Sequence, residues 1–377
     1  MMKQNYPRFI DYWATLDWTD ISLSLRSQTK QDVESALFSE KPNLSQFMAL
    51  LSPAAEPYLE QMAQKAQQLT RQRFGNIVSF YLPLYLSNLC SNDCTYCGFS
   101  MSNKIKRKIL NAEEIEAECQ AIKQLGYEHL LLVTGEHQPK VGMNYFREML
   151  PKIRQHFSSL LMEVQPLDQQ EYEELRHLGI DGVLVYQETY NSSQYAKHHL
   201  RGKKQDFLYR LDTQERLAKS GMDKIGLGAL LGLSDDWRTD LYFLAEHLNY
   251  LQRHYWKSRY SISFPRLRPC TGGMEPASVM NDKQLLQVIC AFRIFFPEIE
   301  LSLSTRESPT FRDNVVPIAI NTISAGSKTQ PGGYANPKPE LDQFSPYDER
   351  SPMEIQNVLI EKGLQPVWKD WDRYLGR

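Results

Sequence analysis

Three cysteines, Cys90, Cys94 and Cys97, form a C-x3-C-x2-C cluster directly after the apolar run 78–86. Thiolates at this spacing on one loop can bind zinc or an iron–sulfur cluster, and both metals prefer four tetrahedral ligands. A structural zinc site needs a fourth protein ligand, but the next histidine downstream, His129, lies a whole predicted helix away. The spacing therefore favours an iron–sulfur cube with one iron open to another ligand. A zinc loop with a remote fourth ligand is the alternative.

Composition and charge restrict the class of protein. The chain has 377 residues, and its 43 basic and 45 acidic side chains give a formal charge of −2, which indicates neither nucleic-acid nor membrane-surface binding. Residues 1–18 contain no continuous apolar core, and no run approaches the roughly 20 apolar residues of a membrane span. Six cysteines in a chain of this length do not form a disulfide framework. Cys119 and Cys290 lie in helical patterns and are expected to be buried. We therefore expect a reducing compartment, the cytoplasm.

The elements that must position the cysteine loop alternate along the chain. After a helical N-terminal part, eight strand-like runs are separated by helical patterns: 78–86, 129–134, 160–165, 182–190, 224–233, 259–265, 299–304 and 319–324. Asn111 and Glu114 match a capping box at the start of one intervening helix. This alternation predicts a (β/α)8 barrel of the TIM type. A doubly wound sheet is the alternative, but Gly226-Leu-Gly228 lacks the third glycine of a dinucleotide fingerprint.

The chain divides into three parts on this reading. Residues 1–75 form a helical N-terminal extension, and residues 76–310 form the barrel core. Residues 311–377 close the barrel and add C-terminal helices and a tail. Trp368 and Trp371 in the tail are expected to pack it onto the barrel.

The barrel places the cysteines on its first βα loop. Active sites of such barrels form from the loops that follow the strands. Polar side chains recur at the predicted strand ends: Thr134, Glu136, His137, Glu163, Gln165, Gln187, Glu188, Thr189, Arg266, Arg268, Thr305, Arg306 and Glu307. We expect these side chains to face the cysteine loop.

The cysteine motif resembles the signature of the radical S-adenosylmethionine (radical SAM) superfamily, CxxxCxΦC, with Tyr96 as the aromatic residue. The flanking segments resemble the tyrosine lyase branch of that superfamily, and the 2-iminoacetate synthases within it. These segments are 85–90 (YLSNLC), 97–100 (CGFS), 133–137 (VTGEH), 186–190 (YQETY), 304–308 (STRES), 327–333 (SKTQPGG) and 368–372 (WKDWD). The match extends over nearly the whole chain and is more specific than the cysteine motif, which many unrelated reactions share.

The resemblance implies a defined chemistry. A [4Fe–4S] cluster is held by Cys90, Cys94 and Cys97, and S-adenosyl-L-methionine chelates its fourth iron. Reductive cleavage of S-adenosylmethionine gives methionine and a 5′-deoxyadenosyl radical, which abstracts hydrogen from L-tyrosine. The Cα–Cβ bond of tyrosine then breaks, giving 2-iminoacetate (dehydroglycine) for thiamine thiazole biosynthesis, together with p-cresol.

The same resemblance assigns four residues to cofactor binding. Tyr96 belongs to the cysteine motif, and Glu136 lies in the segment that contacts the methionine amino group. Glu188 stands where sister enzymes place an acid that contacts the ribose or the amino group of the cofactor. Arg210 resembles the arginine that pairs with the cofactor carboxylate, a group that suits a guanidinium fork. A helix cap for Glu136 and a helix-surface position for Arg210 are the alternatives.

The substrate brings a second carboxylate, which we assign to Arg306, with Glu307 beside it. Glu307, His137 and a carboxylate of the substrate pair are the candidate bases. The competing arginines are Arg266, Arg268 and Arg312. Ser327 or Thr329 could assist by hydrogen bonding. Candidates for the slot around the p-hydroxyphenyl ring are Tyr81, Tyr85, Phe264 and Tyr186.

The implied partners are thiazole synthase, as acceptor of the product, and flavodoxin or ferredoxin, as electron donor. Three rival functions remain open. The hydrogenase-maturation tyrosine lyase carries a second cysteine triad in a C-terminal extension, whereas no cysteine follows Cys290 here. Tryptophan lyases share the cofactor chemistry, but the segments that flank the cysteine motif resemble them less than they resemble the tyrosine lyases. A non-catalytic zinc-binding scaffold is the rival from another class.

Overall fold

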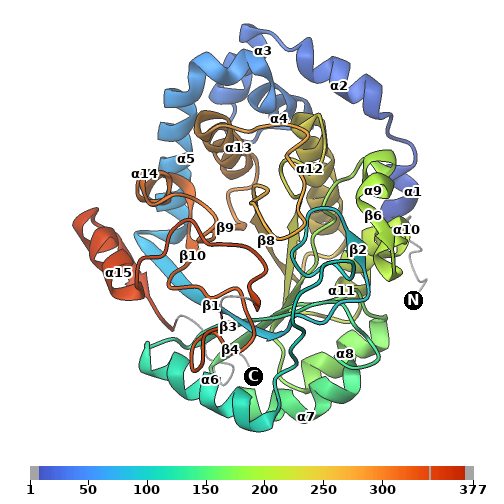
Figure 1. Ribbon diagram of the computed structural model, residues 1–377. Helices are drawn as coiled ribbons and strands as arrows, with labels where there is room; N and C mark the ends of the chain where they lie inside the picture. Colours follow the sequence, from blue (N-terminus) through green and yellow to red (C-terminus); the bar gives the residue numbers. More distant parts are fainter. Residues whose placement is uncertain (1–7, 339–340, 370–377) are drawn as a thin grey trace, which may run out of the picture.

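The computed structural model describes residues 8–338 and 341–369, and its centre is a closed barrel of eight parallel strands (Figure 1). In order around the barrel these are β1 (Ile77–Ser87), β3 (His129–Thr134), β4 (Ser159–Glu163), β5 (Gly182–Leu184), β7 (Lys224–Gly228), β8 (Arg259–Ser263), β9 (Glu300–Leu303) and β10 (Thr322–Ser324). Pairing of Ser79 with Thr322 and of Phe80 with Ile323 joins β10 to β1 and closes the ring. The predicted (β/α)8 barrel is therefore confirmed, and the open sheet is wrong.

Several strands are shorter than predicted, and the difference matters at one of them. β5 ends at Leu184 rather than at Tyr190. Glu188, four residues later, has a φ of 72°, which is incompatible with an extended strand. Regular strand pairing therefore ends early, although Gln187 and Glu188 keep single contacts with Gly228 and Ala229, and residues 185–190 form part of the barrel mouth.

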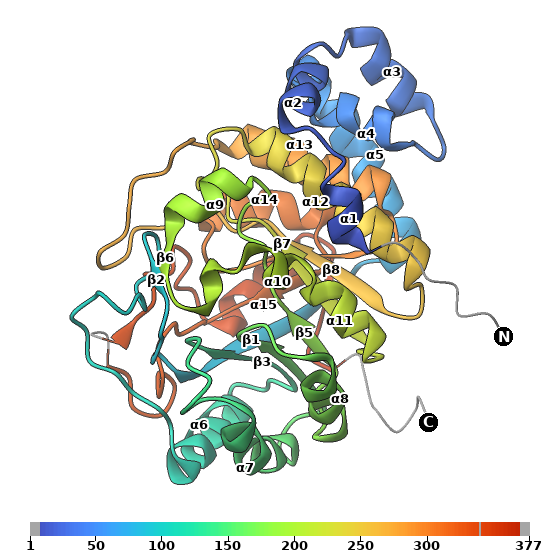
Figure 2. The ribbon, with the colours of Figure 1, turned by 90° about the vertical axis from the view of Figure 1, so that its right-hand side faces the viewer.

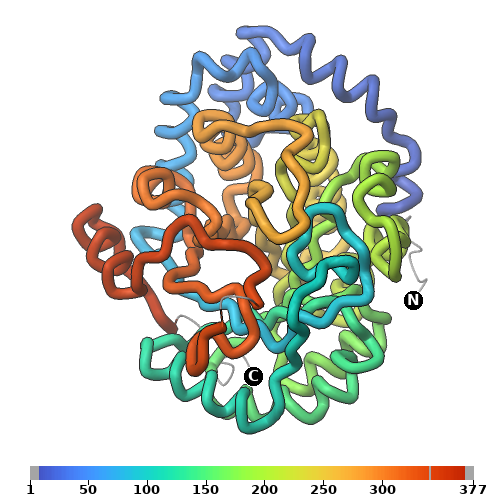
Figure 3. Tube along the Cα trace, in the orientation of Figure 1, coloured from blue at the N-terminus to red at the C-terminus, as the bar shows by residue number. Residues whose placement is uncertain are grey.

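Helices cover the outside of the barrel, as the ribbons and the Cα tube show (Figures 1, 2 and 3). They are α6 (Ala112–Gln124), α7 (Met143–Arg154), α8 (Gln169–His177), α11 (Thr213–Lys219), α12 (Trp237–His254), α13 (Asp282–Phe295) and α14 (Pro309–Ala319). The predicted capping box is present on α6, where the Asn111 side chain accepts from the Glu114 amide at 2.9 Å. The Glu114 carboxylate accepts in return from the Asn111 amide at 2.9 Å. Cys119 on α6 and Cys290 on α13 are fully buried, as predicted.

The N-terminal extension is helical and packs on one side of the barrel, over α12 and α13 (Figure 2). It comprises α1 (Phe9–Trp13), α2 (Trp18–Arg26), α3 (Lys30–Phe38), α4 (Leu44–Leu51), the 3-10 helix η1 (Pro53–Tyr58) and α5 (Leu59–Phe74). Phe9 stacks on His247 of α12 with ring centroids 3.9 Å apart, and Phe47 meets Phe292 of α13 edge-on at 5.1 Å. These aromatic contacts attach the extension to the barrel core.

The C-terminal part adds α15 (Pro352–Glu361) and a short strand, β11 (Gln365–Val367), which pairs with the start of β1. Trp368 stacks on Phe80 of β1 with ring centroids 4.5 Å apart, which confirms its predicted packing role. Trp371 lies outside the described residues. Within 8–338 and 341–369, no helix combines the length and the apolar character needed to cross a membrane.

Candidate active site

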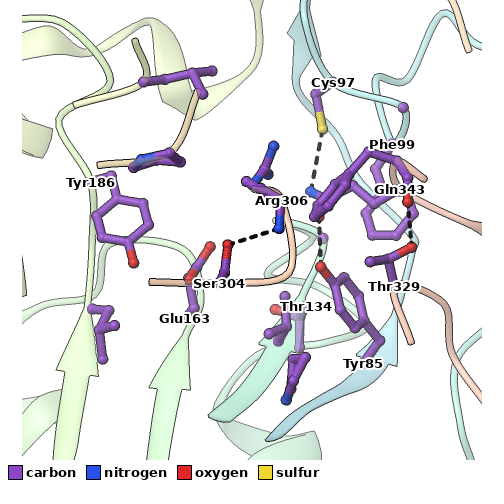
Figure 4. A pocket seen from close by; sticks show the side chains of 18 of the residues that line it. Tyr85, Cys97, Phe99, Thr134, Glu163, Tyr186, Ser304, Arg306, Thr329 and Gln343 are labelled. Carbon is purple, nitrogen blue, oxygen red and sulfur yellow. Dashed lines mark hydrogen bonds between the residues drawn. The ribbon is translucent and has the colours of Figure 1, made fainter. Parts of the chain in front are cut away.

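One pocket opens at the barrel end where the strands terminate, and Cys90, Cys94 and Cys97 all line it. Side chains from the ends of β1, β3, β4, β5, β8 and β9 line its other walls, with residues that follow β10 (Figure 4). Among the predicted site residues, Tyr96, Glu136, Glu188, Arg210 and Arg306 also line this pocket, whereas Glu307 does not. The barrel thus brings together residues more than 200 positions apart in the sequence.

Local contacts fix the conformation of the cysteine loop. The short strand β2 (Asp93–Cys94) pairs with β6 (His199–Arg201), and the Cys94 amide donates to Ser100 Oγ at 2.9 Å. Arg107 donates to the carbonyl oxygens of Phe99 at 2.8 Å and Ser100 at 2.6 Å. The loop therefore presents its cysteines from a hydrogen-bonded frame.

The three cysteines share one pocket, as the ligands of one iron–sulfur cluster must. All three thiols line one pocket, yet no three His, Cys, Asp or Glu side chains in the described chain could hold one metal ion together. Each cysteine of a cubane binds a different iron, so its sulfurs stand apart, whereas zinc draws its ligands onto one centre. Burial, together with the charge of Glu136, raises the pKa of the Cys90 thiol to about 11. Coordination to a metal removes the proton from such a thiol outright.

A cluster of four charged side chains lies beside the cysteines. Arg210, on α10 (Phe207–Leu211), is 5% exposed, so the alternative of a helix-surface arginine is wrong. Its guanidinium contacts Glu136 at 3.0 Å and Glu188 at 3.5 Å. Lys204 Nζ lies 2.6 Å from Glu188 and 3.9 Å from Glu136. Two carboxylates and two cations, all largely shielded from water, thus balance one another.

The electrostatics of this cluster keep both acids ionised. Burial alone would raise the pKa of Glu136 and of Glu188, because it disfavours the charged form. The positive charges of Arg210 and Lys204, with hydrogen bonds to the carboxylates, outweigh burial, and both pKa values are lowered. The same carboxylates raise the pKa of Lys204, which remains protonated. The pocket therefore offers both negative and positive fixed charges to a zwitterionic ligand.

Glu188 occupies its place in strained backbone. Among the described residues it is the only non-glycine with positive φ, at 72°. Such conformations cost about 1–3 kcal/mol and persist where surrounding contacts hold them. Here Lys204 and Arg210 both bind the Glu188 carboxylate, and the Leu230 amide donates to its carbonyl oxygen at 2.8 Å. The strain aims the carboxylate into the pocket.

Lys204 and Asn92 are site residues that the sequence analysis missed. Asn92 Nδ2 donates to Glu136 at 2.7 Å, and its Oδ1 accepts from the Lys204 amide at 3.0 Å. Gly202 allows this approach, because a Cβ there would lie 2.2 Å from Asn92 Oδ1. Gly202 also has a φ of 88°, which favours glycine. That glycine beside two lysines was the one available signal, and it does not name a partner.

Tyr96 is held by a neutral histidine. His199 Nδ1 lies 2.7 Å from the Tyr195 carbonyl oxygen, so this nitrogen carries the proton. His199 Nε2 then accepts from the Tyr96 hydroxyl at 2.9 Å. Burial and the nearby Lys204 charge lower the pKa of His199 to about 2, so the ring stays neutral. Cys270 also lines the pocket, and its Sγ lies 3.2 Å from the Tyr96 carbonyl oxygen.

Among the four candidate arginines, two are committed to acids. Arg266 pairs with Glu307 and Asp282, and Arg312 pairs with Asp348. Neither Arg306 nor Arg268 forms an ion pair within the described residues, and both line the pocket. The Arg306 guanidinium lies 3.7 Å above the centre of the Phe344 ring, and the Arg268 guanidinium lies 4.6 Å from that of Tyr347. Arg306 is therefore available to a carboxylate in the pocket.

Glu307 lies differently from the prediction that grouped it with Arg306. It is 3% exposed and does not line the pocket. Its carboxylate accepts from Arg266 Nε at 3.0 Å. Arg306 and Glu307 lie in the turn that follows β9, and only the Arg306 side chain enters the pocket. The contact with Arg266 ties the loop after β9 to the loop after β8.

Three of the four aromatic candidates line the pocket: Tyr81, Tyr85 and Tyr186. Phe264 does not, because it is 2% exposed and packs against Phe292 of α13 at 4.9 Å. Ser327 and Thr329 both line the pocket, and the buried Ser327 Oγ has no partner among the described residues. A buried hydroxyl without a partner is a candidate ligand contact.

Glu163, at the end of β4, points into the same pocket as Tyr186 and Arg306 (Figure 4). Burial raises the pKa of its carboxyl to about 7, because the opposing charge of Arg306 only partly offsets it. The folded protein therefore binds this proton more tightly than the unfolded chain, whose value is near 4.5. The contribution of Glu163 to stability is greatest at low pH and falls as the pH rises from 4.5 to 7.

We expect Glu163→Gln to stabilise the protein without added ligands at pH 8, by up to ~3 kcal/mol, and to have little effect at pH 4.5. Urea unfolding at the two pH values measures the difference. Glu361→Gln, at an exposed position on α15, is the matched control and should leave the pH profile unchanged. Equal pH dependence in the parent and Glu163→Gln would contradict the raised pKa.

Comparison with known proteins identifies the family. Residues 84–245 match the radical SAM superfamily, and residues 263–365 match the Biotin and Thiamin Synthesis associated domain. The 2-iminoacetate synthase of Salmonella typhimurium strain LT2 is 67% identical over 369 residues, which cover 98% of each chain. That of Escherichia coli K12 matches to the same extent. The chain belongs to the 2-iminoacetate synthase family of radical SAM enzymes.

Solved structures agree with this placement. The maturase HydG of [FeFe]-hydrogenase superimposes with a TM-score of 0.84 at 29% identity, covering 96% of this chain and 79% of that one. HydG from Carboxydothermus hydrogenoformans gives 0.83 at 32% identity, with 93% and 80% covered. Methylornithine synthase, at 21% identity and a TM-score of 0.69, shares the fold.

The cofactors of a radical SAM lyase are a [4Fe–4S] cluster with three cysteine ligands and S-adenosyl-L-methionine. The pocket contains side chains suited to bind each of them. Three cysteines line one wall, and the balanced charge cluster lies beside them. The zinc scaffold is therefore wrong as a description of the chain, which is an enzyme of the carbon–carbon lyase class.

Proposed function

We propose that this enzyme cleaves the Cα–Cβ bond of L-tyrosine to 2-iminoacetate and p-cresol, while S-adenosylmethionine is converted to methionine and 5′-deoxyadenosine. The observation that carries the proposal is the 67% identity to the 2-iminoacetate synthase of Escherichia coli across 98% of both chains. The pocket supports it, because three cysteines, a zwitterion-binding charge cluster and an available arginine share one cavity.

The cofactor half of the pocket is formed by Cys90, Cys94 and Cys97, the proposed cluster ligands. When bound, the cluster and S-adenosylmethionine supply a 5′-deoxyadenosyl radical that abstracts hydrogen. Glu136 and Glu188 can accept hydrogen bonds from the methionine ammonium group, while Arg210 and Lys204 neutralise its carboxylate. Tyr96, fixed by His199, lines the cavity between the cysteines and this charge cluster.

The substrate half of the pocket is formed by Arg306, Ser327 and three tyrosines. Arg306 binds the tyrosine carboxylate in a fork, with Ser327 Oγ as a further donor. Tyr81, Tyr85 and Tyr186 line the space for the p-hydroxyphenyl ring. Glu307 acts indirectly in this scheme, because its bond to Arg266 holds the loop that carries Arg306.

We expect reconstituted enzyme, given S-adenosylmethionine, reductant and L-tyrosine without oxygen, to form p-cresol and 5′-deoxyadenosine in comparable amounts. Chromatography of the quenched reaction measures both products. Glyoxylate should accumulate from hydrolysis of the imine, and neither carbon monoxide nor cyanide should form. If 5′-deoxyadenosine appears with other aromatic amino acids but p-cresol never does, the assignment of tyrosine fails.

The proposed partners of the enzyme follow from the reactivity of its product and from the electron that its cofactor needs. Because 2-iminoacetate hydrolyses readily, we propose direct transfer to thiazole synthase, a role supported by the match of residues 263–365 to the Biotin and Thiamin Synthesis associated domain. Flavodoxin or ferredoxin is the proposed electron donor. All six cysteines are free thiols, which supports a reducing compartment, the cytoplasm.

A further inference from the structure

Gln343, from the segment that follows the barrel closure, reaches into the cysteine pocket (Figure 4). Its Nε2 lies 3.7 Å from Cys97 Sγ, and its Oε1 accepts from the Tyr85 hydroxyl at 2.8 Å. Tyr85 belongs to β1 and lines the substrate half of the same pocket. One amide therefore connects a proposed cluster ligand with a proposed substrate-binding residue.

The backbone holds Gln343 firmly in this position. Its amide donates to the Thr329 carbonyl oxygen at 2.9 Å. Its carbonyl oxygen packs against Gly98, directly after Cys97, so closely that a Cβ on Gly98 would lie 2.2 Å from it. The next residue, Phe344, lies beneath the guanidinium of Arg306. The segment is thus fixed between the cysteine loop and the substrate half of the pocket.

The chemistry of the contacts fixes the orientation of the amide. A metal-bound cysteine sulfur is anionic and accepts hydrogen bonds, so the amide NH₂ group faces it and the amide oxygen receives the tyrosine O–H. Reduction of a cluster adds negative charge, and a donor aimed at a ligand sulfur stabilises the reduced state. Because hydrogen bonds in a chain polarise one another, the Tyr85 hydroxyl strengthens the amide donor.

We propose that Gln343 is a positioning residue that raises the reduction potential of the cluster by donating a hydrogen bond to Cys97 Sγ, and that Tyr85 orients it. The proposal rests on the cluster assignment made above. It gives the C-terminal segment a redox role: the segment that contacts Arg306 also sets how readily the cluster accepts its electron. Within the described chain, Gln343 is the only residue whose side chain hydrogen-bonds both to a cysteine of the triad and to a side chain of the substrate half.

The test is a redox titration of reconstituted full-length protein without S-adenosylmethionine or tyrosine. Electron paramagnetic resonance measures the reduced cluster at each potential. Gln343→Met keeps the side-chain volume but removes both hydrogen bonds. We expect the ratio of reduced to oxidised cluster at a fixed potential to fall about fivefold, the effect of one net hydrogen bond. Tyr85→Phe should lower the ratio in the same direction but by less, because the donor amide remains.

Gln67→Leu on α5 is the matched control, since its amide donates to the Pro317 carbonyl oxygen far from the pocket. Its ratio should equal that of the parent. If Gln343→Met does not load four irons, Gln343→Asn, which withdraws the amide by one methylene, is titrated instead with the same expectation. A loaded variant with an unchanged ratio would overturn the proposal. Since no substrate is present, this outcome is separate from failure of the tyrosine assignment, which the p-cresol assay reports.

Discussion

Cys94→Ala is expected to abolish the cleavage of S-adenosylmethionine, with loss of both 5′-deoxyadenosine and p-cresol. Cys94 is 6% exposed in the short strand β2 and lines the cofactor half of the pocket. A cluster left with two protein thiolates loses one of the bonds that hold it. The effect is therefore a loss of cofactor rather than a slower reaction.

Iron and sulfide analysis of the anaerobically reconstituted variant is the direct measurement. Cys270→Ser is the informative comparison, because Cys270 also lines the pocket but its thiol faces the Tyr96 carbonyl oxygen. We expect Cys270→Ser to load a full cluster and to cleave S-adenosylmethionine. A Cys94→Ala protein with parental iron content and activity would show that the triad is not the ligand set.

The barrel could be predicted from the sequence because its determinants are local. Eight apolar runs alternate with helices that carry their own caps, and each run fell on an observed strand. Strand ends were less predictable, since an apolar pattern does not reveal where pairing stops. At β5 the pattern continues to Tyr190, yet regular strand pairing stops after Leu184 and Glu188 adopts a positive φ. That departure depends on Lys204 and Arg210, which are distant in sequence.

The site was predictable where residue type and barrel position agreed. Glu136, Glu188 and Arg306, which follow predicted strands, line one pocket with the cysteines, and so do Tyr96 and Arg210, which the family resemblance assigned. Lys204 and Gln343 could not be found this way, because neither follows a barrel strand directly. Each enters the pocket through long-range contacts, Lys204 with Glu136 and Gln343 with Tyr85.

Arg306 and Glu307 show the limit of reasoning from adjacency. Both follow β9, but only Arg306 enters the pocket, while Glu307 turns to Arg266. Sequence gives the register of a loop too coarsely to say which of two neighbours faces inward. The choice among the candidate arginines also needs the structure. Arg266 is paired with Glu307 and Arg312 with Asp348, so neither is available to a ligand carboxylate.

Arg306→Ala is expected to lower kcat/KM for tyrosine by about 10²–10³, because the substrate carboxylate would be buried without its partner. Cleavage of S-adenosylmethionine without p-cresol should persist, since Glu136, Glu188, Arg210 and Lys204 are untouched. The ratio of p-cresol to 5′-deoxyadenosine, measured across tyrosine concentrations, therefore separates substrate binding from cofactor binding. Arg306→Lys should recover part of the loss, because it keeps the charge but not the fork.

Arg268 provides the comparison that decides between the two remaining arginines. Its half-buried side chain also lines the pocket, and its guanidinium lies 4.6 Å from the centre of the Tyr347 ring. The charge of Arg306 acts on Glu163 and Glu188 inside the pocket, so we assign the carboxylate to Arg306 and expect Arg268→Ala to cost about tenfold or less. A larger loss of kcat/KM in Arg268→Ala than in Arg306→Ala would assign the substrate carboxylate to Arg268. If Arg306→Ala causes the larger loss, as predicted, the substrate carboxylate lies at Arg306. The ring beneath the Arg306 guanidinium belongs to Phe344, which directly follows Gln343, the residue that contacts Cys97.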